Sequence, residues 1–167
     1  MLALQAFTYL PSLLKLNTMA KRFAYNILMA DDDEDDRVFF QEAMAETVQT
    51  AVVQTANDGL ELMSMLARKN DKLPDAIFLD LNMPRKNGQE CLVEIKTNKA
   101  YKDIPVVIYS TTSNIEQIHS TYVAGANLYI SKPDSYSKLK VILKKVFSLR
   151  CEEYKPQPIK EKFVLKY

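Results

Sequence analysis

Short apolar runs alternate with amphipathic stretches along most of the chain. The apolar runs, each bounded by polar or turn-forming residues, predict buried strands at residues 25–30, 51–56, 76–80, 105–110 and 128–131. Apolar residues at helical spacing predict intervening helices at residues 33–46, 60–69, 88 onward, 114–124 and 135–150. This strict alternation favours the α/β class, with helices on both faces of a parallel sheet.

The order of the strands follows from general rules of chain topology. Right-handed crossovers between five parallel strands favour a doubly wound, flavodoxin-like fold with the strand order 2-1-3-4-5. In this order the first and third strands are neighbours at the point where the strand order reverses. Ligands of open α/β sheets bind at the carboxyl ends of such strands, so any chemistry is expected there.

Polar side chains follow the predicted strands at that rim. They are Asp31 and Asp32 after the first strand, Asp80 at the end of the third, Ser110 at the end of the fourth and Lys132 after the fifth. Plainer interpretations exist: Asp80 could be only the cap of the next helix, and the acids at 31–36 only a solvated block. The joint placement of acids, a hydroxyl and an amine on one rim favours a chemical site.

Three carboxylates held together repel one another, and a hard divalent cation relieves that repulsion. Mg²⁺ prefers oxygen ligands, which makes Asp32 and Asp80 candidate direct ligands. Asp31 would act through a water molecule, and the backbone carbonyl of Asn82 would add a further ligand. Asp80 would keep a nucleophilic carboxylate for an incoming phosphoryl group, whose oxygens the amine and the hydroxyl of the rim would stabilise.

Composition bounds the class of protein. A chain of 167 residues, 47% apolar and 26% charged, is typical of a single globular domain. Outside the acidic run there are 22 Lys and Arg against 15 acids, and without a nucleic-acid-binding motif we expect this excess to be a solvated face. Cys91 and Cys151 lack metal-type spacing and are expected to be reduced, and the single His119 excludes a multi-histidine metal site.

The chain ends are expected to lie outside the main domain. We assign residues 1–23 to an N-terminal extension that is loosely ordered or reflects a mis-assigned start, 24–150 to the domain, and 151–167 to a C-terminal tail. The apolar N-terminal run is shorter than the about 20 residues of a membrane span and lacks the features of a signal peptide. The tail from residue 156 is expected to be loosely ordered.

Four motifs resemble, in order and spacing, the receiver domain of two-component response regulators. They are residues 27–33, residues 78–84 followed by Gly88, residues 107–111, and residues 129–133. The resemblance covers about residues 24–149. It implies that Asp80 accepts a phosphoryl group from a histidine kinase or a phosphotransfer protein and that the chain is a switch, not an enzyme.

The resemblance also implies roles for the neighbouring residues. In the family, the residues matching Asp31 and Asp32 bind Mg²⁺ together with the carbonyl at the position of Asn82. The residue matching Lys132 contacts the phosphoryl group, and the one matching Ser110, which Thr111 follows here, shifts toward it. The residue matching Tyr129 changes rotamer on activation. Serine stands where the family usually has threonine, which keeps the hydroxyl. Asn82 and Thr112 lie where members of the family tune the lifetime of the phosphoryl group.

The length of the chain suggests how the switch is read. Only 17 residues follow Arg150, too few for a DNA-binding or enzymatic domain. We therefore expect a stand-alone, cytoplasmic receiver that switches a surface for a downstream protein still to be identified, with no nucleic-acid or membrane partner and with homodimerisation left open. The alternatives are a phosphate-independent interaction module and an aspartyl-phosphate phosphatase. A phosphatase is expected to have a general acid two positions after its nucleophile, where Asn82 cannot serve.

Overall fold

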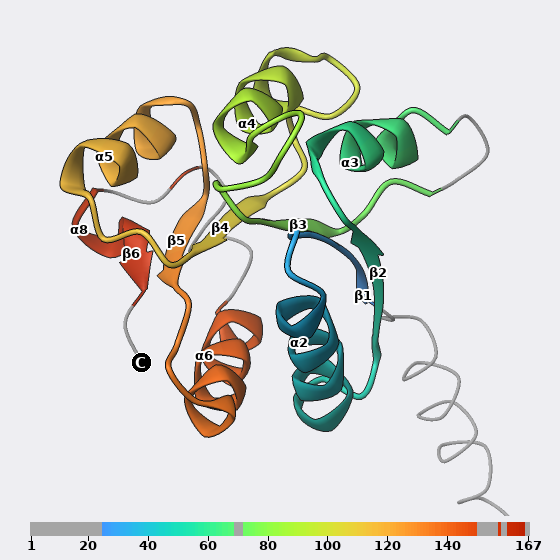
Figure 1. Ribbon diagram of the computed structural model, residues 1–167, viewed down its shortest axis with the longest axis vertical. Helices are drawn as coiled ribbons and strands as arrows, with labels where there is room; N and C mark the ends of the chain where they lie inside the picture. Colours follow the sequence, from blue (N-terminus) through green and yellow to red (C-terminus); the bar gives the residue numbers. More distant parts are fainter. Residues whose placement is uncertain (1–24, 69–71, 150–156, 158–159, 166–167) are drawn as a thin grey trace, which may run out of the picture.

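The computed structural model describes residues 25–68, 72–149, 157 and 160–165 (Figure 1). A single sheet of parallel strands has the order β2-β1-β3-β4-β5-β6, flanked by helices on both faces. The elements in chain order are β1 (Tyr25–Ala30), α2 (Glu34–Thr47), β2 (Ala51–Ala56), α3 (Gly59–Leu66), β3 (Ala76–Leu79), α4 (Gly88–Thr97), β4 (Val106–Ser110), α5 (Ile115–Val123), β5 (Leu128–Ser131), α6 (Tyr136–Ser148), α8 (Lys160–Phe163) and β6 (Val164–Leu165). The predicted doubly wound fold and its five-strand order are confirmed, with a sixth strand added at one edge.

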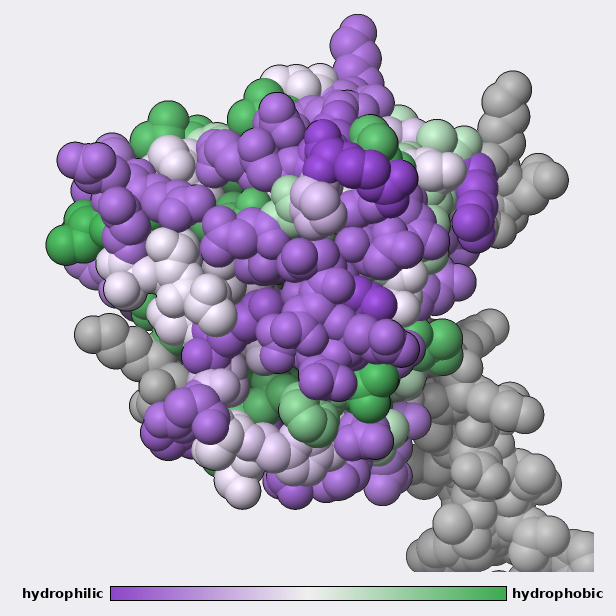
Figure 2. Space-filling model, in the orientation of Figure 1, coloured by the Kyte–Doolittle hydropathy of each residue, from purple (hydrophilic) through white to green (hydrophobic). Residues whose placement is uncertain are grey.

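The two faces of the sheet bury separate apolar clusters. Helices α3, α4 and α5 cover one face, and α2 and α6 cover the other (Figure 1). Because both faces are covered, the central strands read as continuous apolar runs and not as alternating patterns. Every residue of β4, for example, is buried. The outer surface is mostly polar: in Figure 2 hydrophilic side chains dominate the visible face and apolar residues form only scattered groups.

Each main helix begins just past the carboxyl end of a strand, and a polar side chain caps it there. The caps of α2, α3, α4, α5 and α6 are Asp33, Asp58, Asn87, Asn114 and Ser135. Their side chains accept hydrogen bonds from backbone N–H groups of the first helical turn, which otherwise lack partners. The strand-to-helix connections along this rim are therefore fixed locally.

The register of β1 and β3 determines which residues meet at the rim. Ala30 pairs with Leu79 as the last paired residues of these strands. The next residue on each strand is an acid, and the backbone N–H of Asp80 donates to the carbonyl oxygen of Ala30 at 2.9 Å. The backbone N–H of Asp31 donates to the carbonyl of Ala56 on the other side, at 3.1 Å. Main-chain pairing thus holds both carboxylates at the switch point between β1 and β3.

The chain departs from the prediction at its C-terminal end. β6 pairs in parallel with β5, with Val164 opposite Tyr129. Phe163 is only 1% exposed and packs against Tyr122 and Tyr129, with ring centroids 5.1 and 6.2 Å away. The prediction of a loosely ordered tail is therefore wrong for residues 160–165, because an aromatic ring fills a gap beside β5. The prediction for residues 1–23 concerns a segment outside the described residues.

No helix in the described part of the chain is long and apolar enough to cross a membrane.

Candidate functional site

Asp80 lies immediately after β3 and is almost completely buried, at 4% exposure. Its Oδ1 accepts a hydrogen bond from the backbone N–H of Leu81 at 2.8 Å. The interpretation of Asp80 as the cap of the next helix is wrong, because Asn87 caps α4 in a capping box with Glu90. The carboxylate of Asp80 is therefore not used to cap a helix.

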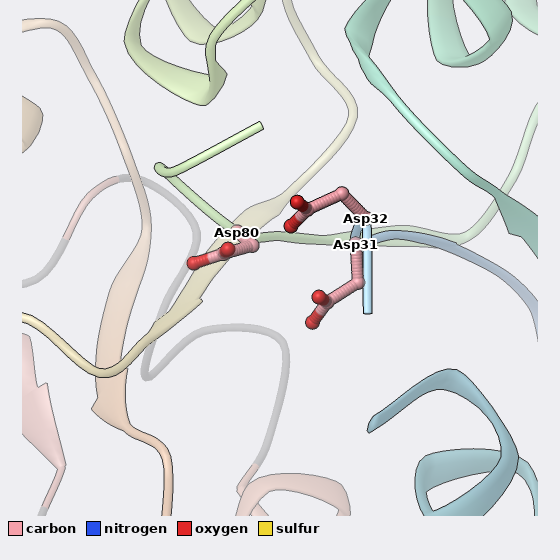
Figure 3. A group of neighbouring side chains, drawn as sticks. All are labelled: Asp31, Asp32 and Asp80. Carbon is pink, nitrogen blue, oxygen red and sulfur yellow. The ribbon is translucent and has the colours of Figure 1, made fainter. Parts of the chain in front are cut away.

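Three carboxylates meet at this rim. Asp31 and Asp32 from the end of β1 and Asp80 from the end of β3 each offer an oxygen, and these oxygens lie within 4.8 Å of one another (Figure 3). Asp31 is buried and Asp32 is exposed, so the cluster opens to solvent on one side. Like charges at this separation raise the free energy of the folded protein unless a cation or a proton offsets them.

Hydrogen bonds hold both the backbone and the side chain of Asp31. Arg37 donates from Nη1 to the carbonyl oxygen of Asp31 at 2.8 Å, and the backbone N–H of Asp33 donates to Asp31 Oδ1 at 3.2 Å. Burial raises the pKa of the Asp31 carboxyl to about 6, opposed by the nearby Lys132 and reinforced by the charge of Asp80. A proton would therefore compete with a metal ion for the Asp31 carboxylate at mildly acidic pH.

Lys132 reaches into the cluster from just past β5, with a side chain only 8% exposed. Its Nζ lies 2.7 Å from Asp36 Oδ2, 2.8 Å from Asp31 Oδ2 and 3.8 Å from Asp80 Oδ2. Burial acts to lower the pKa of this amine, but the close contacts with the Asp31 and Asp36 carboxylates outweigh it and the pKa is raised. Lys132 is therefore a fixed positive charge beside Asp80.

Two buried oxygen atoms at the rim have no hydrogen-bond partner within the described residues: Asp31 Oδ2 and Ser110 Oγ. Asp31 Oδ2 nevertheless lies 2.8 Å from Lys132 Nζ and forms an ion pair with it, so Ser110 Oγ is the atom of the two without a charged partner. A buried oxygen left without a partner costs about 1–3 kcal/mol, and such atoms commonly mark a site for a ligand, an ion or an ordered water. Thr111, the next residue after Ser110, is exposed on the same rim.

Tyr129, in β5, contacts the loop that follows β4. Its ring is fully buried within β5, and its hydroxyl donates to the backbone carbonyl of Thr112 at 2.9 Å. Burial, together with the charge of Asp80, raises the pKa of this phenol to about 12. The loop between β4 and α5 is thus tied to a buried side chain in the neighbouring strand.

The loop after Asp80 is closed by Gly88. The backbone N–H of Gly88 donates to the carbonyl of Leu81 at 3.0 Å, and a Cβ at position 88 would lie 2.0 Å from the carbonyl oxygen of Asp80. Only glycine allows this approach. Asn82 lies inside the closed loop and its side chain is exposed. On the outer side, Arg85 adopts a left-handed backbone with φ of 63° and pairs with the buried Asp58.

Residues 27–144 match the family model of the response regulator receiver domain. The chain belongs to this family.

Individual relatives agree with the assignment. The chain is 34% identical over 110 residues to the response regulator Rcp1 of Synechocystis, covering 64% of this chain and 75% of that protein. Among solved structures, the phosphorylated cyanobacterial phytochrome response regulator RcpA has 36% sequence identity and a TM-score of 0.70, covering 79% of this chain and 94% of that one. A manganese-bound form of Rcp1 has 28% identity and a TM-score of 0.67, covering 81% of this chain and 97% of that one.

The receiver fold brings the residues predicted from sequence onto one rim. Asp31, Asp32 and Asp80 cluster together, Lys132 is ion-paired with Asp31 and Asp80, and Ser110 ends β4 between β3 and β5. The buried carboxylate of Asp31 and the all-oxygen donor set fit a hard divalent cation such as Mg²⁺.

Sequence reasoning missed two neighbours of Lys132. Asp36, in the first turn of α2, accepts its shortest hydrogen bond, and the ring of Tyr109 lies 5.7 Å from Nζ, within the range of a cation–π contact. Asp36 was hidden in the acidic run, where nothing in the sequence separates it from the exposed Asp35.

Proposed function

We propose that this receiver domain is a phosphorylation switch in which Asp80 is the phosphoacceptor. The observation that carries the proposal is the cluster of Asp31, Asp32 and Asp80 at the switch point of the sheet, with the ammonium of Lys132 beside Asp31 and Asp80. A nucleophilic carboxylate, a fixed cation and a cluster suited to a divalent metal are the parts that phosphoryl transfer to a carboxylate requires. The partnerless Ser110 Oγ adds a hydroxyl donor.

In this proposal the metal is Mg²⁺, held by Asp31, Asp32, Asp80 and the backbone carbonyl of Asn82. When bound, it would offset negative charge on the phosphoryl oxygens. An oxygen of the Asp80 carboxylate attacks the phosphorus of a phosphohistidine, the phosphorus–nitrogen bond breaks, and the imidazole leaves and takes up a proton. Lys132 lies 3.8 Å from Asp80 before transfer and stabilises the transferred phosphoryl oxygens.

The phosphoryl group would act on the rest of the domain through the rim. It adds about 1.5 to 2 negative charges and strong hydrogen-bond acceptors at Asp80. Ser110 and Lys132 are drawn toward it, and the loop that carries Thr111 and Thr112 moves with Ser110. Because Tyr129 donates to the carbonyl of Thr112, that movement reaches β5 and α5. This surface would then bind a downstream protein or a second copy of the chain.

The donor is a histidine kinase or a phosphotransfer protein. The relative RcpA is by its title a phytochrome response regulator. A phytochrome-type histidine kinase is therefore the first donor to test, with a kinase of a chemotaxis system as the comparison. Transfer from only one of the two would identify the signalling class.

The test uses acetyl phosphate, a small-molecule phosphodonor, with and without Mg²⁺. Intact-mass measurement should show a gain of one phosphoryl group for the wild-type chain only with Mg²⁺, and none for Asp80→Asn. Asp103→Asn, which removes an exposed acid from a loop remote from Lys132, is the matched control and should be phosphorylated like the wild type. No gain in the wild type, or an undiminished gain in Asp80→Asn, would contradict the proposal.

The same samples separate the alternatives. Multiple turnover of a generic phosphate ester would indicate a phosphatase and not a switch. Partner binding that is unchanged by Asp80→Asn and by removal of Mg²⁺ would indicate a phosphate-independent interaction module.

A further inference from the structure

Lys132 has more acidic neighbours than phosphoryl transfer accounts for. Its ammonium carries three N–H donors and no acceptor. Two carboxylates, Asp36 at 2.7 Å and Asp31 at 2.8 Å, lie within contact distance of Nζ, whereas Asp80 is 3.8 Å away. The hydrogen bond to Asp36 uses one of these donors, and the ammonium is ion-paired with Asp31 and, at the longest distance, with Asp80.

Asp36 differs from Asp31 and Asp80 because it lies outside the carboxylate cluster that fits a metal ion. Asp31 and Asp80 belong to the carboxylate cluster that fits a metal ion, and Asp80 also takes the phosphoryl group in the proposed function. Asp36 is not in that cluster. When a metal ion engages Asp31, that carboxylate is shared between two cations and its hold on Lys132 weakens. Asp36 is then the acid that interacts with the ammonium and with no metal ion.

The backbone of Asp36 is held firmly enough for it to act as an anchor. It lies in the first turn of α2, where the side chain of the cap residue Asp33 accepts hydrogen bonds from the backbone N–H groups of Asp35 and Asp36 at 2.9 and 3.4 Å. Its side chain is 35% exposed and lines a hollow of about 300 Å³ between α2 and the start of α6. Without the carboxylate, the ammonium could turn into this hollow and hydrogen-bond to water.

We propose that Asp36 is a positioning residue for phosphoryl transfer: it anchors the Lys132 ammonium so that its remaining donors face Asp80. The inference rests on the proposed function of Asp80. Its physical basis is the flexible four-carbon stem of lysine, which leaves the ammonium without a fixed direction unless a partner supplies one. A charge-assisted hydrogen bond on the side away from Asp80 supplies that direction.

Three variants test the anchor. Asp36→Asn removes the charge but keeps the size, and Asp36→Glu keeps the charge on a longer stem. Asp35→Asn removes the same charge from the same helical turn, at an exposed side chain, and is the matched control. At saturating Mg²⁺ and acetyl phosphate, the rate of Asp80 phosphorylation should fall about tenfold in Asp36→Asn, since misplacement of a reacting group by about 1 Å can cost up to about a hundredfold. Asp35→Asn should stay near the wild-type rate, and Asp36→Glu should recover most of the loss.

A second measurement does not depend on phosphorylation. The nitrogen–proton NMR signal of the Lys132 ammonium, assigned by its loss in Lys132→Arg, reports whether its protons are protected from water. In the Mg²⁺-loaded protein this signal should persist in the wild type, Asp35→Asn and Asp36→Glu, and it should broaden in Asp36→Asn.

The two measurements distinguish the possible failures. Equal phosphorylation rates in Asp36→Asn and Asp35→Asn, or an ammonium signal that survives in Asp36→Asn, would overturn the anchor while leaving Asp80 as the phosphoacceptor. If the wild-type chain is not phosphorylated at all, the proposed function falls, and the ammonium signal alone decides whether Asp36 holds Lys132.

Discussion

The rim around Asp80 and the C-terminal edge of the sheet both contact β5 but have opposite physical character. At the rim, three carboxylates lie together, and two buried oxygens have no hydrogen-bond partner among the residues that the structure describes. At the edge, Phe163 is buried against two aromatic rings, and the amide of Gln157 donates to the carbonyls of Tyr122 and Ala126 at 2.5 and 2.8 Å. The rim stores unfavourable interactions that a ligand can relieve, whereas the edge contributes stability.

The difference predicts which property each region controls. Substitutions at the edge should lower the free energy of unfolding and leave phosphoryl chemistry nearly unchanged. Substitutions at the rim should impair metal binding and phosphorylation while leaving stability unchanged or raising it. A variant that changed both properties together would show that the two regions are coupled through Tyr129, which touches Phe163 and bonds to the loop after β4.

The largest expected effect is on stability. Phe163→Ala should lower the free energy of unfolding by about 3–5 kcal/mol, because it removes a fully buried aromatic ring and leaves a cavity beside β5. Urea denaturation measures this change. Phe39→Ala is the matched control, since Phe39 is 52% exposed and makes one edge-on ring contact with Tyr136, and it should cost about 1 kcal/mol.

Phosphorylation of Phe163→Ala by acetyl phosphate, measured where the variant is still folded, tests the separation of the two regions. The rate is expected to match that of the wild type. A large fall in rate with a normal ultraviolet circular dichroism spectrum would show that the edge acts on the site through Tyr129.

The second prediction concerns Asp31 and pH. Asp31→Asn should weaken Mg²⁺ binding by more than the about 10–100-fold that loss of an outer-shell partner of a metal costs. It should also raise stability at pH 7.5 in the absence of metal, because the wild-type carboxylate is charged and buried there. Calorimetric titration with Mg²⁺ and urea denaturation check the two effects.

The sign of the pH dependence follows from the raised pKa of Asp31. The folded carboxyl has a pKa of about 6 against an ordinary value of 3.8, so between these values the folded state holds a proton that the unfolded state has lost. The stability that this proton contributes is complete below the ordinary value and is lost as pH rises through about 6. The advantage of Asp31→Asn should therefore be larger at pH 7.5 than at pH 5. An advantage of equal size at both values would contradict the assignment.

How much could be predicted from the sequence differs between the two regions for a physical reason. At the rim, polar side chains directly follow apolar strands, and this contrast is visible in the sequence. Local pattern and topology therefore place five residues on one rim: Asp31, Asp32, Asp80, Ser110 and Lys132. The edge depends on the packing of one aromatic residue, Phe163, against Tyr122 and Tyr129, which come together only in the folded protein. Residues 160–165 are too short for a periodic pattern, and neither α8 nor β6 could be predicted.

Within the rim, the limit of sequence reasoning is the direction of individual side chains. The acidic run shows that charge gathers near the end of β1, but only the structure separates Asp36, which meets Lys132, from Asp35, which is exposed. Gly88 could be recognised from the sequence only as part of a motif, because its role in closing the loop depends on the approach to the carbonyl of Asp80 in the folded protein.

The smallest expected effect on stability is at Ser110. Ser110→Ala removes a buried hydroxyl that has no partner in the described structure, so the free energy of unfolding should be unchanged or higher by up to about 1 kcal/mol. Ser110→Ala should nevertheless remove a hydrogen-bond donor to the phosphoryl oxygens. Loss of one such donor can lower the rate of phosphoryl transfer to Asp80 on the order of a hundredfold. Ser110→Thr keeps the hydroxyl and should keep phosphorylation while paying a packing cost for its extra methyl group in a fully buried position. If Ser110→Ala instead lowers stability by several kcal/mol, the hydroxyl has a structural partner, and the contrast between an unsatisfied rim and a well-packed edge does not hold at β4.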